Sequence, residues 1–252
     1  MARTIAGRVQ IWTSVYRVGS ALVDSGCSSA RPVFAKLLGE RAVTDVLTTH
    51  EHEDHIGNHE LLPPGVRVHA PALAVAFLRE GAPSFPRYRR FFWGTHGTRG
   101  GALVVGEKLN AADRSWRVVQ TNGHSSDHVA YFEEAEQWLF SGDAYMGKFR
   151  AARDAEDLHE EIASLRRMAE LDASMLFPAH GPIIERPRKR LLDVAQHYED
   201  LARKCQALRE KGWSDRRISR EVNGREGWIT IISSGEFSGP KLVRNLLRRQ
   251  PG

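Results

Sequence analysis

The sequence is poor in cysteine and has no long apolar run. Its 252 residues include two cysteines, Cys27 and Cys205, and two cysteines provide no disulfide framework. No apolar stretch approaches the roughly 18 residues that a membrane-spanning helix needs. The N-terminal segment lacks the apolar run of a secretory signal. These absences predict a soluble, cytoplasmic protein with no membrane partner.

The composition excludes a chain that is disordered throughout. Apolar residues make up 41% of it and charged residues 27%, which is ordinary for a globular protein. The formal net charge of +5 is a mild excess for this length. Basic residues cluster at 87–90, 186–190 and 244–249. We interpret these clusters as solvated surface, and contact with a polyanion is the alternative.

Short apolar runs of strand type alternate with helical stretches over the first two-thirds of the chain. Strands are predicted at Arg8–Trp12, Ala21–Asp24, Val43–Leu47, Val66–His69, Trp116–Gln120, His128–Phe132, Trp138–Phe140 and Met175–Phe177. Helices are predicted at Phe34–Leu38, Ile56–Leu61, Ala72–Arg79 and Glu156–Glu170. Strands interleaved with helices indicate an α/β protein whose sheets are covered.

The pattern changes after Glu185, where the predicted strands end. Three helices are predicted beyond it, at Pro187–Lys211, Ser214–Val222 and Pro240–Arg249, and Ser214 has the features of a helix N-cap. We therefore predict a catalytic domain over residues 1–185 and a helical extension over residues 186–252.

A cluster of metal-ligand side chains follows the predicted strand Val43–Leu47. The string Thr49-His-Glu-His-Glu-Asp-His55 holds three histidines and an aspartate at positions that packing does not explain. Imidazole and carboxylate groups are good ligands for zinc and similar divalent metals. Side chains alternate along a strand end, so His50 and His52 would face the same side. Glu51 and Glu53 would point elsewhere, to the surface or to a supporting position.

Three further motifs follow later strands in order: Thr121-Asn-Gly-His124-Ser-Ser-Asp-His128, Ser141-Gly142-Asp143 and Pro178-Ala-His180-Gly-Pro182. Together with His-x-His-x-Asp-His at 50–55, they resemble the signature of the metallo-β-lactamase superfamily. The match extends from about Arg8 to Glu185, and its nearest groups are the glyoxalase II-like and lactamase-like hydrolases with a C-terminal helical extension. The resemblance implies a four-layer αββα sandwich with the metals at one edge.

The resemblance also implies a ligand set for two divalent metal ions, with zinc expected and iron or manganese as alternatives. The first ion would be held by His50, His52 and His124. The second would be held by Asp54, His55 and His180. Asp143 would bridge both. In such a site a bridging hydroxide attacks the substrate, and Asp54 is our candidate to orient it and to accept its proton.

Other residues are expected to support the site or to contact the substrate. Asp24 matches a family position that hydrogen-bonds a ligand histidine, with a simple turn aspartate as the alternative. His128 matches a position that supports the site without binding metal. Tyr145 and Lys148, with Arg150 nearby, follow the bridging aspartate where glyoxalase II-like enzymes use a tyrosine and a lysine to hold the glutathione part of the substrate. Exposed loop residues are the alternative for these.

Asp143 bears on the reaction, because antibiotic-hydrolysing members of the superfamily generally lack this bridging carboxylate. We therefore predict hydrolysis of a small thioester, ester or lactone. An endoribonuclease acting on single-stranded RNA is one alternative, since Ser126-Asp127-His128 and a helical, winged-helix-like C-terminal end also occur in such enzymes. A metal-binding module without catalysis is another. The run Arg87–Trp93 could form a lid, hold nucleic acid or serve packing, and the oligomeric state stays open.

Overall fold

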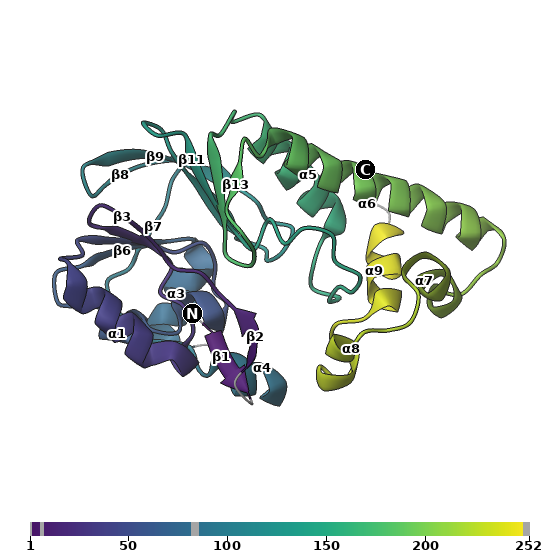
Figure 1. Cartoon of the computed structure of the whole chain (residues 1–252), viewed down its shortest axis with the longest axis horizontal. Coiled ribbons are helices and arrows are strands. Elements are labelled where there is room, and N and C mark those ends of the chain that lie inside the picture. The colour runs from purple at the N-terminus through teal and green to yellow at the C-terminus, as the bar shows by residue number, and fades with distance from the viewer. Residues whose placement is uncertain (1, 6–7, 82–85, 249–252) are drawn as a thin grey trace.

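The computed structural model describes residues 2–5, 8–81 and 86–248. Two sheets face each other in it (Figure 1). The five-stranded sheet has the order β3 (Tyr16–Val18), β4 (Ala21–Val23), β5 (Asp45–Leu47), β6 (Arg67–Ala70) and β7 (Leu103–Val104). The six-stranded sheet has the order β13 (Ile184–Glu185), β12 (Met175–Pro178), β11 (Trp138–Gly142), β10 (Val129–Glu133), β9 (Arg114–Gln120) and β8 (Lys108–Ala111). A separate hairpin joins β1 (Ala2–Ile5) and β2 (Arg8–Trp12).

Both sheets are mixed. In the five-stranded sheet, β4, β5, β6 and β7 run parallel and β3 is antiparallel to β4. In the six-stranded sheet, β11 and β12 are parallel and the other neighbours are antiparallel. The sheets pack on each other through one apolar cluster, in which Leu47 and Val23 meet Trp116, Tyr131 and Phe140.

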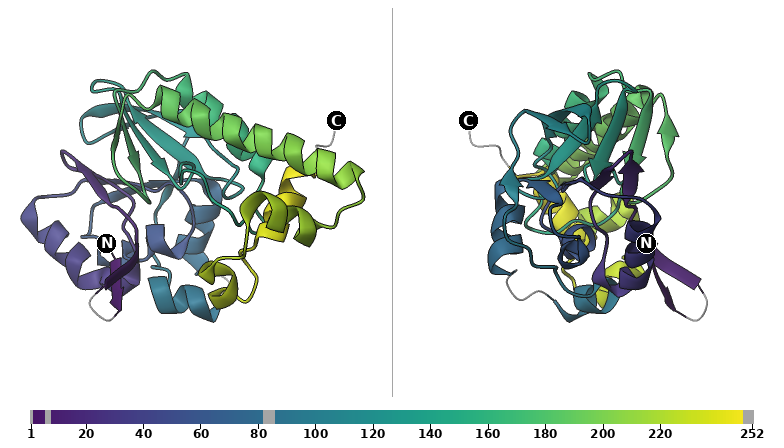
Figure 2. Two further views of the ribbon diagram at one scale, coloured as in Figure 1. Left: turned by 45° about the vertical axis from the view of Figure 1, so that its right-hand side comes forward. Right: turned by 90° about the vertical axis from the view of Figure 1, so that its left-hand side faces the viewer.

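Helices cover the outer face of each sheet. Beneath the five-stranded sheet lie α1 (Arg31–Glu40), the short α2 (Glu53–Ile56) and α3 (Ala72–Glu80), which contribute Phe34, Ile56 and Leu78 to a second cluster. On the six-stranded sheet lies α5 (Leu158–Ala169), and the long α6 (Arg188–Glu210) packs along it (Figure 2). The predicted four-layer αββα sandwich is confirmed.

The remaining helices lie near one end of the sheets. These are α4 (Arg87–Trp93), α7 (Asp215–Asn223), α8 (Trp228–Ile232) and α9 (Gly239–Leu246). The helical extension is confirmed, and Ser214 caps α7 through its side chain. Residues 186–248, all described, contain no strand, so the wing of a winged helix is absent from them. No described helix combines the length and the apolar character needed to cross a membrane.

The division at residue 185 stays a prediction, because both parts share a hydrophobic cluster. Leu158 and Leu165 of α5 pack in it with Leu191 of α6, Ile218 of α7 and Leu242 of α9. The extension therefore completes the outer layer of the sandwich over the six-stranded sheet.

One predicted helix, Ile56–Leu61, is divided in the structure. The α-helix α2 ends at Ile56, and a 3₁₀ turn, η2, spans His59–Leu61; a second, η1, spans Ser28–Ala30. Gly57 lies between α2 and η2, and a Cβ there would stand 2.5 Å from the Ser28 nitrogen and 2.8 Å from the Gly26 carbonyl oxygen. This close approach of two backbone segments fixes the short α2 beneath the loop that carries the histidines.

Candidate metal centre

The segment after β5 carries four of the seven predicted ligands. His50 and His52 follow the end of β5, His52 has extended backbone, and α2 begins at Glu53 directly after it. The single turn of α2 presents Asp54 and His55 from its first positions. The helix start at Glu53 thus separates two pairs of side chains, His50 with His52 and Asp54 with His55, which belong to two adjacent groups.

The first group consists of His50, His52, His124 and Asp143, one ligand atom of each lying within 4.8 Å of all the others. His52 Nδ1 lies 2.9 Å from His50 Nε2 and 3.1 Å from His124 Nε2. Asp143 Oδ2 lies 3.2 Å from His124 Nε2 and 3.9 Å from His50 Nε2. These atoms converge on one point although they come from three separate loops.

The second group consists of Asp54, His55, Asp143 and His180. Asp143 joins it through its other oxygen: Oδ1 lies 3.2 Å from His55 Nε2 and 3.2 Å from His180 Nε2. Asp54 Oδ2 lies 3.3 Å from His180 Nε2 and 3.7 Å from His55 Nε2. Asp143 therefore gives one carboxylate oxygen to each group.

Both groups fit a divalent metal ion. His55 Nε2 and Asp143 Oδ1 are buried and have no hydrogen-bond partner among the described residues, whereas buried polar atoms normally find one. Imidazole nitrogen and carboxylate oxygen are the donors that zinc, iron and manganese accept. Separations of about 3 to 4 Å between these atoms suit ligands that share one ion with bonds of about 2 Å.

The electrostatics of the first group favour ligand-competent protonation states. Burial, with help from neighbouring imidazoles, holds the pKa of His50 well below the ordinary value, and burial together with the charge of Arg153 does the same for His52. A metal binds neutral imidazole. Burial alone would raise the pKa of Asp143, but His180, His55 and His124 outweigh it, so that pKa lies well below its usual range and the carboxylate is ionised.

In the second group, the neighbouring carboxylates favour protonated imidazoles, because they raise the pKa values of His55 and His180 against the effect of burial. Burial would lower the pKa of His180, but Asp143 and Asp54 raise it to about 10. Burial would raise the pKa of Asp54, but His55 and His180 lower it to about 2. A cation entering here displaces imidazole protons and keeps the same charge balance with the carboxylates.

Asp24 and His128 hold the ligand candidates in place. Asp24 directly follows β4 and has a left-handed φ of 62°, and its Oδ2 accepts a hydrogen bond from His55 Nδ1 at 2.7 Å. Because that bond uses His55 Nδ1, the other ring nitrogen, Nε2, faces the remaining members of the second group. His128 Nε2 accepts from the Asp143 backbone nitrogen at 3.1 Å, so His128 positions Asp143 and lies outside both groups.

A cavity of about 470 Å³ opens over both groups. Its apolar wall consists of Trp12, Tyr88, Phe92, Trp93, Met146, Phe149, Ile229 and Phe237. Helix α4 supplies three of these, including Trp93, whose ring centroid lies 5.9 Å from that of His180. The Arg87–Trp93 run is therefore a wall of the site, and it also contacts the extension, where the Phe92 and Trp228 rings lie 6.5 Å apart.

Comparison with known proteins identifies the family. The family model described as the metallo-beta-lactamase superfamily matches residues 8–180. The chain belongs to this superfamily. It is thus one of the superfamily's metal-dependent hydrolases, and the alternative of a non-catalytic metal-binding module is not supported.

Relatives in the superfamily cover most of the chain. A lactamase-like protein, adaB, of Aspergillus niger is 28% identical over 249 residues, which are 95% of this chain and 69% of that protein. An atrochrysone carboxyl ACP thioesterase of Aspergillus fumigatus is 27% identical over 90% of this chain and 70% of that protein. A solved beta-lactamase domain protein from Burkholderia ambifaria matches with a TM-score of 0.68 at 23% identity, covering 96% of this chain and 78% of that one. That last likeness shows the fold alone.

Two arginines of this superfamily member lie at the site without having been predicted. Arg89 donates to both oxygens of Glu53, at 2.6 Å each, and Glu53 is buried where a surface position had been one expectation. Arg153 Nη1 and Nη2 lie 3.4 Å from His52 Nε2 and His124 Nε2. Neither arginine belongs to a metal-ligand motif, although Arg89 lies in the Arg87–Trp93 run that was considered as a lid.

Tyr145 and Lys148 are not brought to the cavity. Tyr145 is buried in the cluster under α6, and its hydroxyl accepts from Arg190 Nε at 3.1 Å. Lys148 is exposed and lies near Asp193 of α6. Their neighbours Met146 and Phe149 line the cavity instead, and Arg150 lines a pocket beside it.

Proposed function

We propose that the protein hydrolyses a small carbonyl substrate, namely a thioester, ester or lactone, with two divalent metal ions. The observation that carries this proposal is Asp143, whose two oxygens each reach a different group of ligand candidates under one largely apolar cavity. The relative named as a thioesterase supports a thioester among these classes.

In this proposal the seven residues divide as the sequence predicts. The first ion would be held by His50, His52 and His124. The second would be held by Asp54, His55 and His180, and Asp143 would serve both. Five imidazoles and two carboxylates favour zinc, with iron or manganese as alternatives. When bound, such ions acidify a water to form the nucleophile and polarise the carbonyl group.

Asp54 is the residue that we assign to the proton of the attacking water. Thr13 Oγ1 donates to Asp54 Oδ2 at 2.9 Å, and His180 Nε2 lies 3.3 Å from the same oxygen. Asp54 also lines the cavity. Because these contacts all involve Oδ2, we assign Oδ1 to accept that proton and to orient the water toward the carbonyl carbon.

Arg153 is the residue that we assign to the developing oxyanion. It is held by Glu156, whose Oε1 accepts from Arg153 Nε at 3.0 Å, and by the Phe237 ring at 5.2 Å. A His52 that binds metal through Nδ1 carries its proton on Nε2 and cannot accept from Arg153. The Nη1 hydrogens then face the cavity, where they donate to the carbonyl oxygen as charge builds on it.

We also propose a cellular compartment for the enzyme. We place the enzyme in the cytoplasm, and the free thiols of Cys27 and Cys205, both buried, are consistent with a reducing compartment. Its partner would be a small substrate enclosed by the aromatic wall.

A substrate panel tests the proposed function. The zinc-loaded protein is assayed with a short thioester, an aryl ester, a lactone, a phosphodiester and single-stranded RNA. We expect turnover of at least one carbonyl substrate that is abolished by a chelator and restored by zinc. RNA cleavage that weakens with salt, without turnover of any carbonyl substrate, would identify an endoribonuclease and overturn the proposal.

A further inference from the structure

A second pocket adjoins the catalytic cavity. It measures about 290 Å³, and Met146, Phe149, Ile229 and Phe237 line both spaces. It lies between the loop after β11 and the helices α7 and α8 of the extension. The shared walls make the two spaces neighbours, so a substrate longer than the cavity has a way out along the extension.

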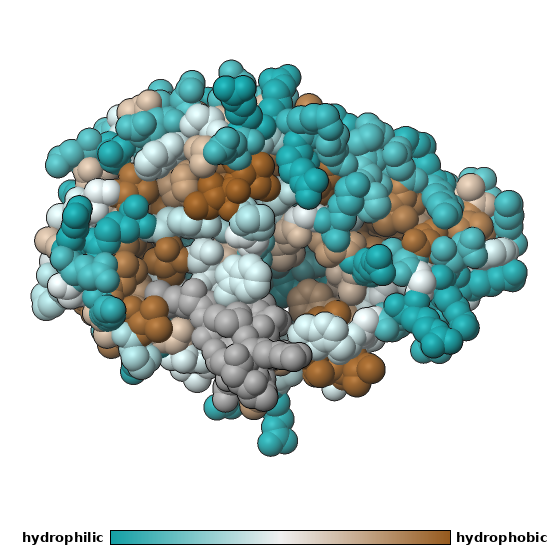
Figure 3. All heavy atoms as spheres, viewed as in Figure 1, coloured by the Kyte–Doolittle hydropathy of each residue, from teal (hydrophilic) through white to brown (hydrophobic). Residues whose placement is uncertain are grey.

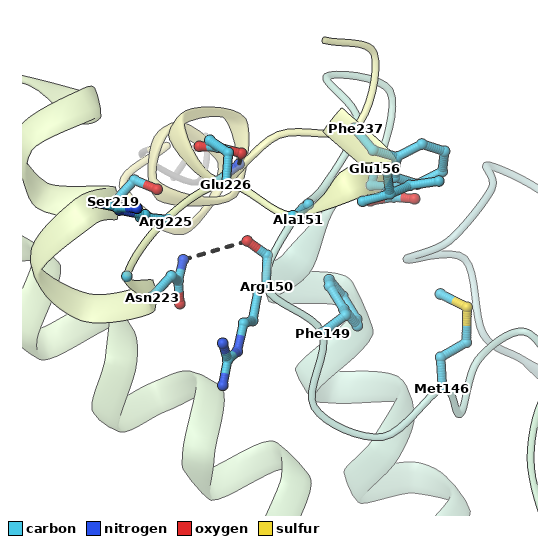
Figure 4. Close-up of a pocket in the computed structure, with 14 residues that line it drawn as sticks. Met146, Phe149, Arg150, Ala151, Glu156, Ser219, Asn223, Arg225, Glu226 and Phe237 are labelled. Carbon is cyan, nitrogen blue, oxygen red and sulfur yellow. Dashed lines mark hydrogen bonds between the residues drawn. The ribbon is translucent and has the colours of Figure 1, made fainter. Parts of the chain in front are cut away.

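The second pocket changes from apolar to polar across its width. Figure 4 shows Phe149, Phe237 and Met146 on one side and Ser219, Asn223 and Arg225 on the other. The Asn223 amide donates to the Arg150 carbonyl oxygen at 3.3 Å, which ties α7 to the loop after β11. A ligand here would meet apolar surface first and cationic side chains further out.

Beyond Arg225 the pocket continues into a groove of about 560 Å³, since Gly224, Arg225 and Glu226 line both. The groove is basic: Arg216, Arg220, Arg225, Lys241 and Arg244 line it, and hydrophilic side chains gather over this end of the molecule (Figure 3). Lys241 and Arg244 pair with Asp154.

Four guanidinium groups along this path lack a carboxylate partner among the described residues, namely Arg150, Arg216, Arg220 and Arg225. Glu226 lines the same path, but its Oε2 accepts from Thr230 Oγ1 at 2.7 Å and from the Gly239 nitrogen at 3.2 Å, and it forms no ion pair with these arginines within the described part of the chain. Its single negative charge offsets only part of the charge of the four guanidinium groups. Unpaired guanidinium groups lining a concave surface are suited to phosphate oxygens. The outer end of the path therefore matches an anion.

We propose that this path binds the phosphate-bearing thiol arm of an acyl thioester, with the acyl group in the catalytic cavity. The inference rests on the proposed function and names its substrate class. Hydrolysis breaks the C–S bond, adds the hydroxyl of water to the acyl carbon and a proton to the sulfur, and leaves the thiol in the second pocket. A phosphopantetheine-type arm has the required order: thiol, slender amide chain, phosphate.

The wall of the groove favours this arm over RNA. Single-stranded nucleic acid is held by aromatic side chains on which bases stack as well as by cations. The described residues that line the groove include no aromatic side chain. It therefore offers contacts to phosphate without a stacking surface.

Binding of matched probes tests the inference without catalysis. Titration calorimetry on the zinc-loaded protein compares 4′-phosphopantetheine with pantetheine, which differs only by the phosphate, so any thiol–metal contact cancels. We expect the phosphorylated probe to bind at least tenfold more tightly. Arg225→Ala and Arg150→Ala should remove that advantage, and the control Arg79→Ala, at an exposed arginine of α3 paired with Glu80, should keep it.

Equal affinity for the two probes, or an advantage that survives both substitutions, overturns the inference. So does a salt-sensitive complex with a short RNA in place of the phosphorylated probe. Failure of the proposed function would give a different result. In that case no carbonyl substrate would be turned over, while the phosphate-dependent binding would persist.

Turnover measurements then show whether the thiol arm belongs to a free thioester or to one tethered to a carrier protein. The same acyl group is offered on pantetheine, on 4′-phosphopantetheine, on coenzyme A and on a carrier protein. We expect KM to fall at least tenfold between the first two, with kcat within about twofold. A lower KM for coenzyme A points to free thioesters, and a lower KM for the carrier points to tethered ones. Equal KM values for the thioesters of pantetheine and of 4′-phosphopantetheine would contradict the assignment.

Discussion

At the scale of single residues, the centre depends on side chains that orient other side chains. Asp24 accepts from Thr49 as well as from His55, with its Oδ1 2.8 Å from the Thr49 nitrogen. One carboxylate thus ties the loop before the histidines to a ligand candidate. Gly142 is equally constrained, because its φ is 50° and a Cβ there would stand 2.8 Å from His128 Nε2. Any side chain at 142 would push His128 away from Asp143.

Arg153→Ala is predicted to lower kcat by about 100-fold with a small change in KM, because the lost donor acts on the oxyanion. Arg153→Lys should recover part of the rate, since one N–H donor can still reach the cavity. Steady-state kinetics on the zinc-loaded variants measure both constants. The zinc content serves as the control and should match wild type; kcat values equal to wild type in the alanine variant would contradict the role of Arg153.

Residue roles differed in how far the sequence could predict them. The seven ligand candidates lie in four short motifs, and the resemblance of these motifs to the superfamily signature was enough to predict them as one set. Arg153 was missed because it reaches the site from a segment without ligand-type residues. Arg89 lies in the run that was considered as a lid, but its pairing with Glu53 was not predicted. Tyr145 was expected at the substrate and lies in the core, because sequence spacing cannot tell which side of the loop after β11 faces the cavity.

At the scale of elements, α2 and α4 shape the centre together. Arg89 of α4 is held against Glu53 of α2, with side-chain exposures of 14% and 1%. This ion pair joins the aromatic wall to the helix that carries Asp54 and His55. Helix α4 was not predicted as a helix, because its glycine- and proline-rich surroundings and alternating arginines give no clear period.

Glu53→Gln is predicted to destabilise the fold by about 3 kcal/mol, because it leaves the Arg89 guanidinium buried without its counter-charge. Urea unfolding of the zinc-loaded proteins measures this free energy. The exposed pair of Arg79 and Glu80 provides the matched control, and Glu80→Gln should cost less than about 1 kcal/mol. Equal effects at the two sites would show that the pair between α2 and α4 is not specially stabilising.

At the scale of the whole molecule, the two sheets are joined by polar links as well as by the apolar core. Asp45 in β5 accepts from Arg67 and His69 in β6, at 2.9 Å each. Its Oδ2 also accepts from the Ala112 nitrogen at 3.0 Å, in the turn between β8 and β9 of the other sheet. Burial would raise the pKa of Asp45, but Arg67 and the other donors lower it to about 2.

This link makes a pH-dependent contribution to stability. The pKa of Asp45 falls from 3.8 to about 2 on folding, so its stabilisation is present above about pH 4 and is lost as the pH falls through about 2. Asp45→Asn should therefore cost about 1–3 kcal/mol at pH 7, and the difference from wild type should shrink below pH 3. Unfolding curves of both proteins across this range measure it; a difference independent of pH would contradict the ionised link.

The α/β class followed from the order of strands and helices, and the four-layer sandwich from the resemblance of the motifs to the superfamily. The contribution of the extension to the site followed from neither. Ile229 and Phe237 lie far along the chain from the histidines, and no spacing relates them to the metal centre. They reach the cavity because α6 carries the chain across α5 and returns it at α8. Long-range placement of this kind depends on packing that a sequence pattern does not encode.

The central claim is that Asp143 serves two metal ions at once, and metal content measures it most directly. After reconstitution with zinc and removal of free ions, elemental analysis of the wild type should give close to two zinc ions per chain. Asp143→Asn should bind at most one and lose most hydrolytic activity, while Asp172→Asn, at an exposed turn, should keep two. A wild type that takes up no metal, or an Asp143→Asn protein that holds two ions as tightly as wild type, would contradict the account.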